Sequence, residues 1–143
     1  MSIPNADHAF DAVLTMLRKA TGKQWGDDIA PGADTVALED PYGVAEFVPG
    51  GGVIEGDIGQ PSSMMAIVVQ LTSVARTRKG ATALAARAHQ AMLVMGPAGY
   101  SDPIVPAPPT LVLSRRHDSS GGVDREGPLF NAAERYVLTL SSV

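Results

Sequence analysis

The sequence has no cysteine, so disulfides, thiolate metal sites and cysteine nucleophiles are all excluded. Aromatic residues make up only 5% of the chain, and no apolar run approaches the roughly 20 residues that span a bilayer as a helix. The N-terminus begins with acidic rather than basic residues, which is unlike a signal peptide. We therefore expect a soluble, unexported protein with an aliphatic core and no membrane partner.

Positive charge is missing from one continuous part of the chain. No lysine or arginine lies between Lys23 and Arg76, although many carboxylates do, so the net charge of −4 hides a segregation of charge. Such a block is either an ordinary solvated surface or a face that repels DNA or meets a basic partner. The sequence leaves both interpretations open.

What is present favours one globular domain over residues 1–143. A hydrophobic content of 45% is enough for a packed core, and the length is typical of a single domain. Glycine (15) and proline (11) are abundant, which indicates long irregular loops between the regular elements.

Two segments have the spacing of amphipathic helices. Asp7 can cap a helix to about Ala20, because Phe10, Val13, Leu14 and Leu17 recur at i, i+3, i+4 and i+7, and Gly22 can end it. Thr77 can cap a second helix through about Met95. Its predicted buried face is Ala81, Leu84, Ala85, Ala88, Met92 and Met95.

Four segments rich in β-branched and apolar residues predict strands, at 42–48, 64–74, 111–116 and 134–141. The order is then α-β-β-α-β-β. Because each strand pair is joined without a helix, we expect an α+β fold with an antiparallel four-stranded sheet, in which mixed pairing is possible, and both helices on one face. The long loops are predicted at 23–41, 49–63, 96–110 and 121–130.

The glycine-rich segments do not have the pattern of a phosphate-binding loop. No Gly-Lys-Ser/Thr opens a helix, and the segment GGGVIEG carries acidic charge. His8 and His89 lack metal-site spacing, whereas His117 with Asp124 and Glu126 could form a metal or acid–base site if the fold brought them together. We expect no catalytic residues, no cofactor and no metal.

Four segments together resemble a known family. These are MLRKATGKQWGDDIAP, DPYGVAEFVPGG, QLTSVARTRKGATALAARAHQAML and GGVDREGPLFNAAERYVL. From about Leu14 to Leu140 the chain resembles the tail terminator proteins of long-tailed actinobacterial bacteriophages. The most specific parts of the resemblance are the strand-to-helix join and the C-terminal segment, and neither is a catalytic signature.

The resemblance implies a structural virion protein without enzymatic activity. Such proteins form a homohexameric ring at the head-proximal end of the tail tube, stop its polymerisation and offer a docking surface to the head–tail connector. The implied partners are further copies of the chain, the major tail tube protein and a connector or stopper protein. DNA passes through the ring without specific binding, and the protein assembles in the host cytoplasm.

Two alternatives to a tail terminator remain open at this stage. The nearest is a head–tail stopper or adaptor, because small connector proteins share this architecture. A more remote one is a small ligand- or metal-binding enzyme domain.

A closed ring needs a heterologous interface, in which different patches of neighbouring subunits meet. Apolar residues in loops and charged residues at element ends are the candidates for these contacts. They are Trp25, Val53, Ile54, Arg76, Arg78, Arg87, Ile104, Val105, Asp124, Arg125, Glu126, Leu129 and Phe130. Acidic side chains are expected to face the DNA channel, and the candidates are Asp27, Asp28, Asp34, Glu55 and Asp57.

Overall fold

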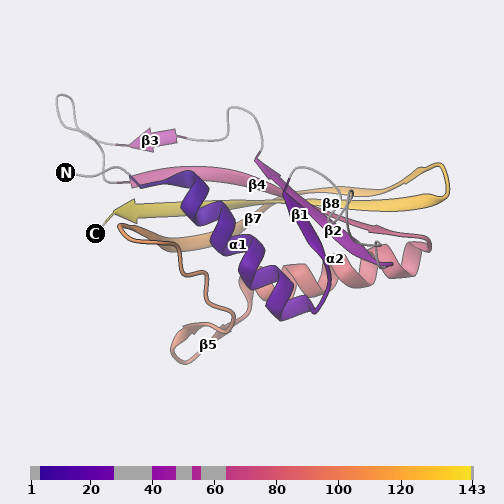
Figure 1. Cartoon of the computed structure of the whole chain (residues 1–143), viewed down its shortest axis with the longest axis horizontal. Coiled ribbons are helices and arrows are strands. Elements are labelled where there is room, and N and C mark those ends of the chain that lie inside the picture. Colours follow the sequence, from indigo (N-terminus) through magenta and orange to yellow (C-terminus); the bar gives the residue numbers. More distant parts are fainter. Residues whose placement is uncertain (1–3, 28–39, 48–52, 56–63, 143) are drawn as a thin grey trace.

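The computed structural model describes residues 4–27, 40–47, 53–55 and 64–142, the segment 53–55 by its backbone alone (Figure 1). Two helices and eight strands follow one another along the chain. They are α1 (Ala6–Thr21), β1 (Trp25–Asp27), β2 (Tyr42–Phe47), β3 (Val53–Glu55), β4 (Met64–Ala75), α2 (Arg78–Leu93), β5 (Met95–Gly96), β6 (Gly99–Tyr100), β7 (Thr110–Glu126) and β8 (Leu129–Ser142).

The main sheet has the order β1-β2-β4-β8-β7, and β3 also pairs with β4. Strand β1 runs parallel to β2, while the other pairs in this sheet are antiparallel. The protein is α+β, as predicted, and β1 with β2 gives the mixed pairing that the prediction allowed. The expected strand number of four is wrong, because the sheet has six strands. Strands of three residues, such as β1 and β3, are too short to show the alternation that identifies a strand in a sequence.

The helix boundaries follow from their caps. Asn5, rather than Asp7, caps α1, because its side-chain oxygen accepts the N–H groups of Asp7 and His8 at 2.9 and 3.2 Å. Gly22 ends this helix in the left-handed region, with φ of 67°. As predicted, Thr77 caps α2 and accepts the N–H of Gly80 at 3.0 Å.

The predicted buried stripe of α1, which begins at Phe10, is confirmed. Helix α2 ends at Leu93, earlier than predicted, and Met95 at the end of its predicted apolar face is 64% exposed.

One face of the sheet and both helices share a core. Side chains alternate across a strand, so Ile67, Val69 and Leu71 of β4 point to the same face as Tyr136 and Leu138 of β8. The alanine-rich side of α2 and the apolar stripe of α1 pack on that face. The core is therefore aliphatic with few aromatic rings, as the composition predicted.

Trp25 is the largest side chain of this core, and it is only 1% exposed. Its indole Nε1 donates to the hydroxyl of Thr21 at 3.0 Å, and its carbonyl accepts two hydrogen bonds from the guanidinium of Arg18. The ring lies directly over Gly43 of β2, where a Cβ atom would overlap it. The predicted loop at 23–41 thus contains a short buried strand, and Trp25 is not the exposed contact residue that we expected.

Substitution of Gly43 by alanine is expected to destabilise the fold, because the new methyl group overlaps the buried indole and the ring must move. We expect the free energy of unfolding in urea to fall by about 1–3 kcal/mol. Gly96→Ala is the matched control, since a Cβ there meets no atom closer than 3.7 Å. Equal stability of the Gly43→Ala variant and the native protein would contradict this packing.

Candidate functional site: the β7–β8 hairpin

Strands β7 and β8 form a hairpin that runs along the whole length of the molecule (Figure 1). Its register continues to the pair Glu126↔Leu129, and the turn lies at 127–128, with Gly127 at φ of 60°. The loop predicted at 121–130 is therefore mostly strand. Gly122 does take a positive φ of 73°, but at a register shift between Ser120 and Gly122 rather than in the turn.

The hairpin turn is exposed and carries both signs of charge. Asp124, Arg125 and Glu126 are exposed, while Leu129 and Phe130 are partly buried. The Arg125 guanidinium lies 5.6 Å from the centre of the Phe130 ring, and its Nε donates to the carbonyl of Gly127 at 3.1 Å. The Arg125 side chain thus makes contacts within the turn, and the turn presents charge at the end of a hydrogen-bonded hairpin.

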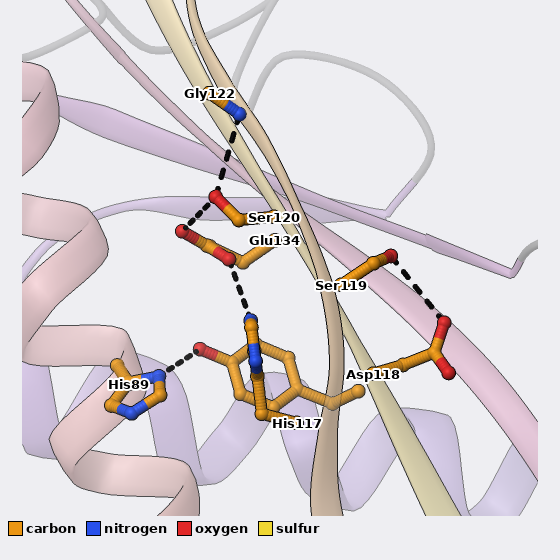
Figure 2. A network of polar contacts seen from close by, with 8 residues as sticks. His89, His117, Asp118, Ser119, Ser120, Gly122 and Glu134 are labelled. Atoms are coloured by element: carbon orange, nitrogen blue, oxygen red, sulfur yellow. Dashed lines mark hydrogen bonds and ion pairs between the residues drawn. The ribbon is translucent and has the colours of Figure 1, made fainter.

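A network of polar side chains fastens the middle of the hairpin to α2 (Figure 2). The ring Nδ1 of His89, on α2, lies 3.1 Å from the hydroxyl of the buried Tyr136 on β8. His117 Nε2, on β7, lies 2.7 Å from one carboxylate oxygen of Glu134, and the Ser120 hydroxyl donates to the other oxygen at 2.9 Å. The His117 ring meets the Tyr136 ring edge-on, with centroids 5.4 Å apart.

This network contains a serine, a histidine and a carboxylate, as a catalytic triad does, but they are hydrogen-bonded in a different order. In a serine hydrolase the histidine contacts the serine and the carboxylate orients the histidine. Here Glu134 lies between His117 and Ser120, so the serine donates to the carboxylate and no hydrogen bond joins it to the histidine. An open groove of about 400 Å³ lies beside the network, and its walls include Ala85 of α2 and Ala132 of β8. We interpret the network as a clamp between helix and hairpin.

Arg115 makes a second connection between β7 and α2. Its guanidinium donates to the carbonyls of Ala91 and Met92 at 3.3 and 3.2 Å, and thereby caps a helix that has no basic residue in its own last turn. The same group lies 4.1 Å from the centre of the Tyr100 ring. Burial lowers the pKa of Arg115, and this effect is opposed by the nearby Tyr100 and Asp102.

The predicted contact residues fall into three groups. Arg76, Arg78 and Arg87 are exposed, and Val105 is 78% exposed. Ile104 is buried at 7% and so is not free for an outside contact. The contact candidates Val53 and Ile54 have no described side chain. Of the acids expected to face the channel, Asp28, Asp34 and Asp57 lie outside the described residues, and Glu55 has no described side chain. Asp27, at the end of β1, is exposed.

The possible metal or acid–base site does not form. His117 pairs with Glu134, Glu126 accepts from Asn131 at 3.2 Å, and Asp124 lies opposite Asn131, seven residues along β7 from His117. Within the described ranges no three His, Asp or Glu side chains lie close enough to hold a metal ion. Nothing in the sequence indicated that His89, which lacks metal-site spacing, contacts Tyr136, because no short motif links residues 47 positions apart.

No protein-family profile matches the chain, and no curated protein is significantly similar to it. Among the described residues, no helix is both long and apolar enough to cross a membrane.

The buried Tyr136 predicts a loss of stability at alkaline pH. Burial, with a smaller effect of Glu134, raises the pKa of this phenol well above its ordinary value of 10.0. Because the folded-state pKa is the higher one, the stability contribution is complete below pH 10 and is lost as the pH rises above it. Tyr136→Phe is expected to flatten this decline in the free energy of unfolding.

At neutral pH the same variant is expected to be about 1 kcal/mol less stable, because the hydrogen bond to His89 is lost. Tyr42→Phe, on β2, serves as the control and keeps the alkaline decline. An identical decline in Tyr136→Phe and the native protein, measured by urea unfolding between pH 8 and 11, would refute the assignment.

Proposed function

We propose that this protein is a phage tail terminator, which forms a ring on the head-proximal end of the tail tube, stops its polymerisation and receives the head–tail connector. Two observations support the proposal: the resemblance of the sequence to tail terminators and the distribution of exposed side chains on the subunit. The observation that carries it is that the subunit has two different contact-prone ends, one charged and one apolar.

The charged end is the hairpin turn, with Asp124, Arg125 and Glu126 exposed. The apolar end lies near the β5–β6 hairpin, towards the opposite side of the molecule (Figure 1). There Val94, Met95 and Val105 are 47%, 64% and 78% exposed. Two unlike patches favour a heterologous contact, and repetition of such a contact gives a ring when the rotation closes.

The rigid hairpin suits this role better than catalysis. Its polar side chains satisfy one another and hold the strands on α2, which would keep the turn in one position while subunits assemble. A terminator has to present one fixed surface to the tube and another to the connector, so a preorganised contact favours closure of the ring.

The test uses purified tail tube protein from the same virus, polymerised with and without this protein. We expect native protein to halt tube growth and to be found by immunogold labelling at one tube end. A variant that lacks residues 124–129, closed by a two-residue turn, is expected to let tubes grow on. Lys23→Ala, away from the hairpin, is the control.

Continued growth of tubes in the presence of native protein would contradict the proposal. Labelling of the head connector without any effect on tube length would instead favour a stopper or adaptor.

A further inference from the structure

We propose that the hairpin turn of one copy docks into the groove between α1 and the β6–β7 connection of the next copy. This inference rests on the proposed ring, and it names the two surfaces that meet.

The groove has a volume of about 350 Å³ and lies at the apolar end of the subunit. Its apolar lining comes from both sides, with Ala12 and Met16 on α1 and Pro103 and Val105 on the connection. Two charged residues of opposite sign also line it, Lys19 and Asp102. Among the described residues neither forms an ion pair, although Asp102 is near enough to act on the charge of Arg115.

The connection holds Val105 outward in a fixed position. Its neighbours Ile104 and Pro106 are buried, so Val105 alone of the three faces solvent. Prolines at 103 and 106 restrict the backbone further. The N–H of Ser101 donates to the carbonyl of Val94 at 2.9 Å, which joins this segment to the exposed end of α2. Docking would remove this apolar surface from water.

The hairpin turn complements the groove in charge and in apolar surface. Arg125 could face Asp102, and Glu126 could face Lys19, which gives two opposite-charge pairs at the edge of the contact. Between them the exposed Pro128 and the partly buried Leu129 offer apolar surface to Met16 and Val105. The occupant we propose is therefore the segment 125–129 of a second copy.

A subunit cannot fill its own groove. The connection ends where β7 begins, and the turn follows β7, a strand of 17 residues that spans about 50 Å at its usual rise. A turn that docks in this groove therefore belongs to another copy, and each subunit then uses one end to bind and the other to be bound. Repetition of that contact gives the head-to-tail arrangement that a ring requires.

The absence of native cysteine permits a clean cross-linking test. We would mix two single variants of the whole chain, Val105→Cys and Pro128→Cys, under mild oxidation, and identify the products by mass spectrometry. We expect a disulfide-linked heterodimer of the two. The control replaces Val105→Cys by Lys79→Cys, which is exposed on α2 outside the groove, and should give little heterodimer.

Disulfides only between copies of the same variant, efficient coupling of Lys79→Cys to Pro128→Cys, or no cross-link would each overturn the docking. If the native protein still caps tail tubes in that case, the proposed function survives and only this contact is wrong. If capping also fails, both are wrong.

Charge-reversal variants test the same contact without any introduced cysteine. Lys19→Glu and Glu126→Lys should each weaken self-association about 5- to 10-fold by sedimentation velocity, because each places like charges together. The double variant restores opposite charges and should return to within about 3-fold of the native protein. Lys79→Glu, on the exposed side of α2, is the matched control. The pairing would be overturned if the double variant weakened self-association by the product of the two single-variant effects.

Discussion

The pairing of β8 with a strand on either side is the constraint on which the rest of the structure depends. Strand β8 hydrogen-bonds to β4 on one side and to β7 on the other. Its buried residues Tyr136, Leu138 and Leu140 belong to the sheet face on which both helices pack. Because β8 is held along almost its whole length, β7 and the turn that follows it are held as well. The hairpin is therefore a continuation of the core sheet, and its position is fixed by the same pairing that stabilises the fold.

The sequence predicted those elements that carry a long periodic signal. Local sequence was enough to predict the buried stripe of α1, the cap at Thr77 and strands β2 and β4, because apolar spacing and cap chemistry involve neighbouring residues. The hairpin was misread, since glycines and charges at 121–126 are typical of a turn, whereas Gly122 lies at a bulge and Gly127 in the turn itself. Bulges depend on the partner strand, which no local pattern reveals.

The candidate site was less predictable than the fold. His89, His117 and Tyr136 come from three elements, and only their packing brings the rings together. Trp25 was misplaced for a related reason, because its burial depends on Gly43, a residue 18 positions away that leaves room for the indole. Asp124, Arg125 and Glu126, which were predicted as contact residues, are exposed.

Electron microscopy of the purified, assembled protein tests the central claim of this account, that unlike ends of one subunit join head to tail into a closed ring. The account predicts rings of sixfold symmetry, in which every β7–β8 turn lies at a contact with the neighbouring subunit. Two-fold dimers that join equivalent surfaces, or rings in which the turns point into solvent, would contradict it.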